Sequence, residues 1–321
     1  MKLNDYQEQA ARTIVTHDGV TDPLVIPLLG LVGEAGELLS EYKRKLRDRD
    51  AHELFADVIR EELGDILWYT SDIATKFGLG LEDIAQANLD KLRDRYLAET
   101  RTDTFFDERL PPEERIPRTF EVCFYQKKLG KRARLRMFKE DGAQIGDELT
   151  DNAYTDDGYR FHDIFHFSYA THLGWSPVTR KFLRKKRASN GDLDEIEDGG
   201  RAWVFEEAIS ALVFQHARRM RYFEGVRRVD GRLLKEIKSL TSGIEVRIRS
   251  KLAWEEAILG GYDIWRKVRD HRGGWVSCDL IHKKMNFRPC TSEDLANFAR
   301  RTDELEFAET GDIQPIASHV V

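Results

Sequence analysis

Two pairs of acidic residues on neighbouring apolar segments constrain the fold of this chain more than any other feature. Glu34 and Glu37 lie in the segment PLLGLVGEAGELLSEY. The second pair, Glu62 and Asp65, lies in IREELGDILWY. Residues three apart share one face of a helix. If the two helices pack antiparallel, the four carboxylates converge inside a helical bundle.

Converging carboxylates need a cation. Like charges about 4 Å apart repel by roughly 4 kcal/mol at an effective dielectric constant of about 20. Mg²⁺ takes oxygen ligands and keeps positions for water and phosphate oxygens, so the sequence predicts a Mg²⁺ site, with Mn²⁺ as the alternative ion. Solvated or salt-bridged acids explain one such pair more readily than two. Gly33, Gly36 and Gly64 lie within the same helices, where they leave room for a substrate or for close helix approach.

The first hundred residues are predicted to be helical throughout. Four segments carry helical patterns: Leu3–His17, Leu24–Arg47, Ala51–Phe77 and Leu81–Leu97. Gly78 is a suitable stop after the third helix. Helices joined by short loops favour an antiparallel four-helix bundle.

The rest of the chain reads as mixed α and β, so the expected fold class is mainly α, with a C-terminal α+β domain. Residues 101–118 contain three prolines and many charges and are predicted to be a linker. The alternating segments 119–125 and 132–138 predict a hairpin around Gly130. Further helices are expected at about 159–173, 201–223, 230–239 and 251–269, and a strand within GGWVSCDLIHKKMNF. The predicted domains are therefore 1–100 and 119–321.

Composition and charge exclude several classes of protein. No apolar run approaches the ~18 residues that a membrane-spanning helix needs. The N-terminus lacks a signal-peptide pattern, and the three cysteines are widely spaced, which argues against a disulfide framework. These observations predict a cytoplasmic location. Residues 1–100 hold 12 Lys or Arg against 20 Asp or Glu, so no broad nucleic-acid binding is expected.

The N-terminal motifs resemble those of a known family. Glu34-Ala-Gly-Glu37, 24 intervening residues and Glu62-Leu-Gly-Asp65 are similar to the ExxE…ExxD signature of the MazG-like all-α nucleoside triphosphate pyrophosphohydrolases. The surrounding segments GLVGEAGEL, EELGDILWY and ANLDKLRDRY also match the family. The resemblance covers about residues 1–98. It implies Mg²⁺-dependent cleavage of an NTP or dNTP between the α- and β-phosphates, giving a nucleoside monophosphate and pyrophosphate. It also implies a homo-oligomer.

The same resemblance implies roles for individual residues. The metal ligands and catalytic residues would be Glu34, Glu37, Glu62 and Asp65, and Glu34 is also a candidate to orient or deprotonate the attacking water. Asn88, Lys91 and Arg95 resemble the third motif and would contact sugar and phosphate; a polar outer stripe is the alternative. Tyr69 lies four residues after Asp65 and is either a contact for the base or a core residue.

A second cluster lies in the C-terminal half. His162 and His166 share a helix face, with Asp163 beside them, and Glu206 lies about 40 residues further on, next to Glu207. Two histidines at this spacing with a distant glutamate form a candidate transition-metal site, to which we assign His162, Asp163, His166 and Glu206. Histidines among phenylalanines are more often satisfied core residues, so both interpretations stay open.

Three functional hypotheses remain. The first is a pyrophosphohydrolase with an appended α+β domain. The second is a nucleotide-binding sensor that hydrolyses slowly and signals through its C-terminal domain, and the third adds a metal-dependent hydrolase at the histidine cluster. The basic run RKFLRKKR at 180–187 is either solvated surface or a lip over the nucleotide. The intact acidic motifs favour the enzyme, and the lack of GxxxxGK[ST] argues against a P-loop ATPase.

Overall fold

The computed structural model describes residues 1–14, 22–49, 55–97, 105–129 and 132–311. The chain divides into two compact units, Met1–Arg93 and Asp94–Val321. The predicted fold class is confirmed, since the N-terminal part is helical and the C-terminal part combines helices with an antiparallel sheet. Within the described ranges, no helix combines the length and apolar character needed to span a bilayer.

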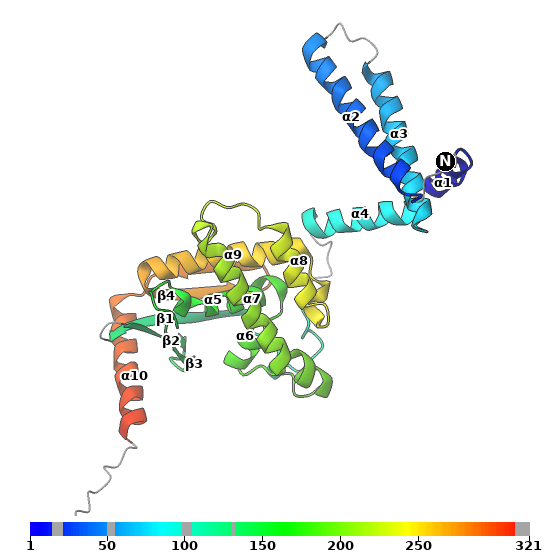
Figure 1. The fold of residues 1–321 in the computed structure, drawn as a ribbon. Coiled ribbons are helices and arrows are strands. Elements are labelled where there is room, and N and C mark those ends of the chain that lie inside the picture. Colours follow the sequence, from blue (N-terminus) through cyan, green and yellow to red (C-terminus); the bar gives the residue numbers. More distant parts are fainter. Residues whose placement is uncertain (15–21, 50–54, 98–104, 130–131, 312–321) are drawn as a thin grey trace, which may run out of the picture. The chain divides into compact units, whose positions relative to one another are not determined.

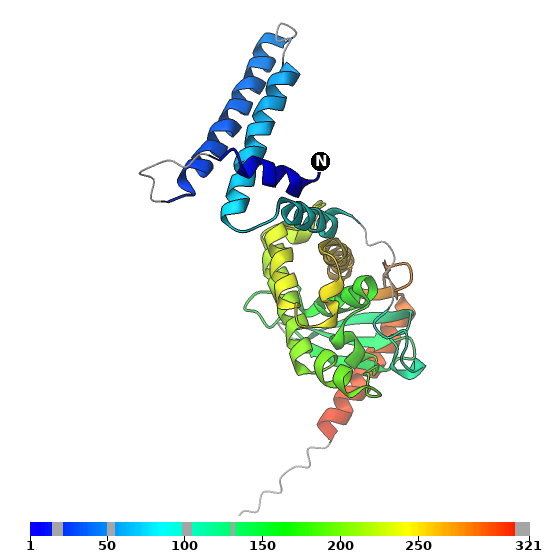
Figure 2. The ribbon, with the colours of Figure 1, turned by 90° about the vertical axis from the view of Figure 1, so that its right-hand side faces the viewer.

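The helices of the first unit lie close to their predicted positions. They are α1 (Leu3–Ala11), α2 (Val25–Asp48), α3 (Phe55–Lys76) and α4 (Leu81–Tyr96). Both views show α2 and α3 side by side and running in opposite directions (Figure 1, Figure 2). The helix α1 is shorter than predicted, and residues 15–17 of that prediction lie outside the described ranges. The antiparallel pair brings the two acidic motifs onto facing helices.

Gln7 holds α1 against the connection between α3 and α4. Its Nε2 donates to the carbonyl of Leu79 at 2.9 Å, and its Oε1 accepts from the backbone N–H of Leu81 at 2.8 Å. The N–H groups of a first helical turn lack partners within their own helix, so Gln7 satisfies one of them in α4. Trp68 adds a second link, because its Nε1 donates to Thr13 Oγ1 at 2.7 Å.

A five-stranded antiparallel sheet with the order β3-β2-β1-β4-β5 is the frame of the second unit. Its strands are β1 (Thr119–Leu129), β2 (Arg132–Lys139), β3 (Gln144–Leu149), β4 (Gly273–Asp279) and β5 (Lys284–Arg288). The predicted hairpin is β1 and β2, with Cys123 opposite Phe138. On its other side β1 pairs with β4, and Cys123 lies opposite Trp275. Strand β3 was not predicted.

Helices cover both faces of this sheet. The helices of this unit are α5 (Asp163–Leu173), α6 (Pro177–Phe182), α7 (Gly200–Arg218), α8 (Gly231–Leu240), α9 (Lys251–His271) and α10 (Ser292–Gly311), of which α5, α9 and α10 pack on the sheet. Successive strand residues point to opposite faces, so Phe124 joins the main core with Phe165 and Trp265, whereas Cys123 packs with Phe298 of α10. The helices α6 and α10 were not predicted.

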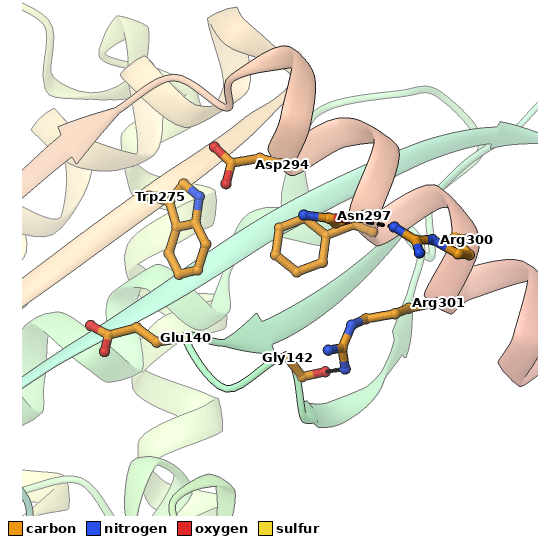
Figure 3. A pocket seen from close by; sticks show the side chains of 8 residues that line it. Glu140, Gly142, Trp275, Asp294, Asn297, Arg300 and Arg301 are labelled. Atoms are coloured by element: carbon orange, nitrogen blue, oxygen red, sulfur yellow. Dashed lines mark hydrogen bonds between the residues drawn. The ribbon is translucent and has the colours of Figure 1, made fainter.

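The helix α10 leaves a pocket open beside the sheet face on which it packs (Figure 3). A pocket of about 520 Å³ lies between α10, β4 and the turn from β2 to β3, and Trp275 and Asn297 are among its lining residues. Arg301 of α10 reaches that turn, where its Nη1 donates to the carbonyl of Gly142 at 2.8 Å.

Residues 105–118, predicted to be part of a linker, belong to the second unit and contribute Asp107 and Ile116 to its interior. Asp107 is buried, and its carboxylate accepts hydrogen bonds from Arg118 at 2.7 Å, Arg180 at 2.9 Å and the N–H of Ile116 at 2.8 Å. Burial alone would raise the pKa of Asp107, but these donors outweigh it and lower the pKa. Arg118 and Arg180 thus neutralise the buried charge of Asp107, which the composition of the segment did not indicate. Residues 101–104 lie outside the described ranges.

The basic run at 180–187 also contributes to the interior. Arg180 and Arg187 are almost completely buried. Arg187 Nη2 lies 2.7 Å from Asp198 Oδ1 and 2.8 Å from Glu245 Oε1. The interpretation of the run as solvated surface is therefore wrong for Arg180 and Arg187, which belong to a buried network of charged side chains.

Candidate functional site

The two acidic pairs meet between α2 and α3. Carboxylate oxygens of Glu34, Glu37 and Glu62 all lie within 4.8 Å of one another. Glu34 and Glu62 are half-buried, whereas Glu37 and Asp65 are exposed. Asp65 is outside the 4.8 Å group, but its charge acts on both Glu34 and Glu62. The structure thus brings three of the four predicted ligands together and places the fourth nearby.

We call Glu34, Glu37, Glu62 and Asp65 the acidic cluster. Their negative charges repel one another. Desolvation raises the pKa of Glu34, the charges of Asp65 and Glu37 raise it further, and a hydrogen bond with Glu62 opposes them. The pKa of Glu62 is raised by desolvation and then by its acidic neighbours. A bound divalent cation would instead lower the pKa values of Glu34 and Glu62. Because every donor is a carboxylate oxygen, the set fits Mg²⁺ or Mn²⁺.

Two tyrosines border the acidic cluster. Burial and then the charge of Asp65 raise the pKa of Tyr6, which places α1 beside the acids; no sequence motif pointed to this residue. Tyr69 packs on α2, because a Cβ atom added at Gly30 would lie 2.2 Å from its ring. Its ring therefore fills the space between α2 and α3, one helical turn from Asp65.

The three residues of the third predicted motif differ in their surroundings. Asn88 and Lys91 are exposed on α4. Arg95 lies in the second unit, where it donates to Glu255 Oε2 and to the carbonyl of Val229, each at 2.9 Å. Arg95 thus has two partners in the second unit, and its contact with sugar or phosphate stays a prediction.

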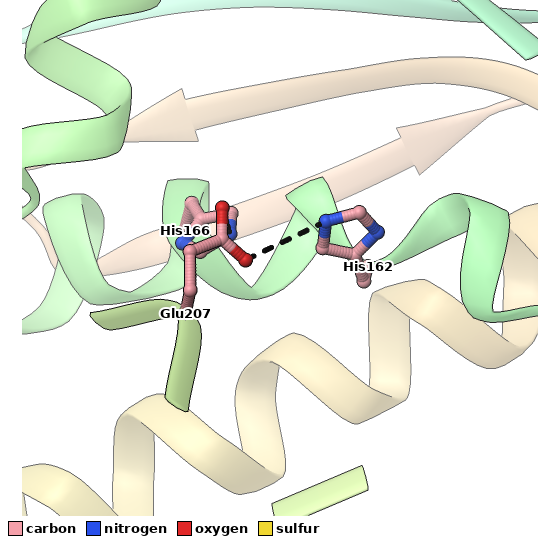
Figure 4. A group of neighbouring side chains, drawn as sticks. All are labelled: His162, His166 and Glu207. Carbon is pink, nitrogen blue, oxygen red and sulfur yellow. Dashed lines mark ion pairs between the residues drawn. The ribbon is translucent and has the colours of Figure 1, made fainter. Parts of the chain in front are cut away.

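The second cluster forms where α5 faces α7 (Figure 4). Nε2 of His162 lies 3.8 Å from Glu207 Oε2, and Nε2 of His166 lies 3.5 Å from Glu207 Oε1. Asp163 Oδ1 is 3.5 Å from the first of these nitrogens and 3.9 Å from the second. We call His162, Asp163, His166 and Glu207 the histidine cluster.

Glu206, which the sequence assigned to this group, is engaged elsewhere. It is fully buried, and its Oε1 accepts from His166 Nδ1 at 2.9 Å and from Ser176 Oγ at 2.6 Å. Its Oε2 accepts from the backbone N–H of Val178 at 2.9 Å. Glu207 therefore occupies the place that we expected Glu206 to take.

The groups around His166 shift one another's pKa values. Burial alone would lower the pKa of His166, but the charge and hydrogen bond of Glu206, followed by Glu207, raise it to about 10. Burial raises the pKa of Asp163, against the two histidines, which lower it. Without a cation, a protonated His166 thus balances the surrounding carboxylates.

Both parts of the chain match family models. The model of the MazG C-terminal domain matches residues 101–291, and that of the MazG nucleotide pyrophosphohydrolase domain matches residues 27–97. The chain belongs to the MazG family. The residues matched to the MazG nucleotide pyrophosphohydrolase domain include all four members of the acidic cluster. The predicted relationship is confirmed, and this MazG chain is a nucleotide pyrophosphohydrolase.

A phage protein is similar to part of the chain. The Gene 37 protein of Mycobacterium phage L5 is 41% identical over 102 residues, which cover 30% of this chain and 89% of the phage protein. No solved structure matches the chain. The histidine cluster lies within the residues matched to the MazG C-terminal domain.

Proposed function

We propose that the first unit of this MazG chain hydrolyses nucleoside or deoxynucleoside triphosphates between the α- and β-phosphates. The products are a nucleoside monophosphate and pyrophosphate. The observation that carries this proposal is the convergence of Glu34, Glu37 and Glu62 within 4.8 Å. Carboxylates held this close are stabilised by a hard divalent cation, and the same cation attracts a triphosphate.

The acidic cluster provides the groups that such a reaction needs. When bound, Mg²⁺ or Mn²⁺ supplies charge neutralisation and polarises phosphoryl oxygens. Glu37, Glu62 and Asp65 would hold the ion. Glu34 is half-buried and has a raised pKa, which suits it to accept a proton from the attacking water. The water oxygen bonds to the α-phosphorus, the bridging P–O bond breaks, and pyrophosphate leaves with the electron pair.

A second copy of the chain is the proposed partner of the first unit. On α2, side chains at seven-residue intervals are exposed: Val25 by 40%, Val32 by 71%, Leu39 by 69% and Leu46 by 63%. Apolar residues at this spacing follow one face of a helix and favour packing against another helix. On α3, Leu63 and Leu67 are exposed as well. These surfaces support a homo-oligomer in which two copies bury them against each other.

Turnover and its metal dependence test the enzymatic proposal. The purified full chain is incubated with a panel of NTPs and dNTPs, with Mg²⁺, with Mn²⁺ or with a chelator. We expect hydrolysis only with a metal, a loss in Glu37→Gln, and retention in Glu61→Gln, which removes a neighbouring exposed carboxylate outside the cluster. Tight Mg²⁺-dependent nucleotide binding without turnover would instead support the sensor hypothesis.

A further inference from the structure

The histidine cluster holds its donor atoms at the spacing of a metal site (Figure 4). The ligand atoms of His162, His166 and Glu207 lie within 4.8 Å of one another. The separations between the two Nε2 atoms and the oxygens of Asp163 and Glu207 run from 3.5 to 3.9 Å. Donors bound tetrahedrally to Zn²⁺ at about 2.0–2.1 Å are about 3.4 Å apart. The donors of His162, His166 and Glu207 are therefore close to the spacing of metal ligands, and Asp163, which lies outside the 4.8 Å group, is beside both nitrogens.

Hydrogen bonds orient both imidazole rings for this role. Nδ1 of His162 donates to the carbonyl of Tyr159 at 2.9 Å, and Nδ1 of His166 donates to Glu206 at 2.9 Å. A neutral ring with its proton on Nδ1 carries a lone pair on Nε2. Metal-binding histidines typically donate their other N–H to a carboxylate or a backbone carbonyl. Both forms of that arrangement occur here, and both Nε2 atoms face Glu207.

The buried Nε2 of His166 is a second observation that points to a ligand at this place. The side chain is fully buried, and no hydrogen-bond partner for this nitrogen occurs among the described residues. A cation at the centre of the cluster would satisfy it.

Glu206 fixes the ring of His166 from behind. Its two oxygens are anchored by Ser176 Oγ and by the backbone N–H of Val178, so the carboxylate is held at the start of α6. Glu206 is therefore a positioning residue, not a ligand.

We propose that the histidine cluster binds a divalent transition-metal ion such as Zn²⁺ through His162, His166, Glu207 and Asp163. Imidazole nitrogens with carboxylates suit Zn²⁺ and similar ions, whereas Mg²⁺ prefers oxygen donors alone. The side chain of Glu207 is 44% exposed, so one side of the centre opens to solvent. The chain would then carry two centres of different chemistry, one in each unit.

Calorimetric titration with Zn²⁺ tests this centre separately from the acidic cluster. The full chain carrying Glu37→Gln, which weakens the acidic cluster, is stripped with a chelator and titrated. We expect one Zn²⁺ per chain. Adding Glu206→Gln should weaken binding roughly 10–100-fold, and Glu207→Gln should weaken it further because a ligand is lost. Glu236→Gln, an exposed residue on α8, is the matched control and should leave the affinity unchanged.

Visible absorption of the Co²⁺-loaded chain gives a second readout. A four-coordinate Co²⁺ centre absorbs strongly, and this band should disappear in Glu207→Gln. Circular dichroism of the metal-free variants checks that they are folded; if Glu207→Gln is not, His162→Gln replaces it. Failure of the folded parent to bind Zn²⁺, or binding that both substitutions leave unchanged, would overturn the proposal.

Discussion

Nδ1 of His166 donates a hydrogen bond to Oε1 of Glu206 at 2.9 Å, and both side chains are fully buried. This bond joins α5 to α7 in the interior of the second unit. Charge-assisted bonds of this kind are short and stronger than neutral ones. Glu206 also accepts hydrogen bonds from Ser176 Oγ and from the N–H of Val178. Its carboxylate therefore links α7 to α5 and to α6.

Replacing Glu206 by glutamine should destabilise the second unit. The substitution leaves His166 without its buried counter-charge, and breaking such a pair costs about 3–5 kcal/mol. Urea unfolding of the metal-free chain measures the change. Glu207→Gln is the control, because its half-exposed side chain should change the free energy of unfolding by no more than about 1 kcal/mol. Equal losses in the two variants would contradict this assignment.

Asp107 should make the stability of the second unit sensitive to acid. Its folded-state pKa lies below the ordinary value of 3.8, so its contribution is fully present above that pH and is lost as the pH falls through the folded value. Asp107→Asn should cost about 3 kcal/mol at neutral pH, since Arg118 and Arg180 lose a buried partner. In unfolding measurements, the difference from the parent chain should shrink below pH 3.8. A difference that does not vary with pH would argue against this role.

Gly30 and Gly33 should respond in opposite ways to alanine. At Gly30 the added Cβ would lie 2.2 Å from the ring of Tyr69, so Gly30→Ala should lower the stability of the first unit by about 1–3 kcal/mol. At Gly33 the Cβ meets no described atom within 4 Å, and alanine should raise helix stability by about 1 kcal/mol. Thermal unfolding compares the two. If Gly33→Ala is more stable yet less active, a substrate or a second copy occupies that space.

Charge on the exposed face of α2 should break the proposed oligomer. Val32→Glu places a carboxylate within the stripe of four apolar residues on α2, where an interface would desolvate it. Light scattering coupled to size-exclusion chromatography should show the parent as an oligomer and this variant as a monomer. Ile281→Glu, at a residue that is 61% exposed in the second unit, should not change the mass. A monomeric parent chain would contradict the proposal.

The acidic cluster could be predicted because its signal is local. Spacings of three residues place Glu34 beside Glu37 and Glu62 beside Asp65 whatever the tertiary structure, and two short-looped helices have few ways to pack. The sequence analysis did not identify the apolar stripe on α2, which became apparent only from the structure, where the described residues leave its side chains exposed.

The choice between Glu206 and Glu207 could not be made from the sequence. Neighbouring helical residues point about 100° apart, so only the packing of α7 on α5 decides which carboxylate faces Nε2 of His166. The short strand β3 escaped prediction because QIGDEL contains a glycine and two acids, residues that are depleted in strands. Arg180 and Arg187 resembled solvated surface because two of their acidic partners, Asp107 and Glu245, lie far away in the sequence.

The products of nucleotide hydrolysis test the proposed chemistry most directly. The full chain is incubated with Mg²⁺ and the preferred triphosphate, and all phosphorus-containing products are resolved and quantified. We expect the nucleoside monophosphate and pyrophosphate in equal amounts, a loss of both in Glu37→Gln, and their retention in Glu61→Gln. A nucleoside diphosphate with orthophosphate would contradict cleavage between the α- and β-phosphates.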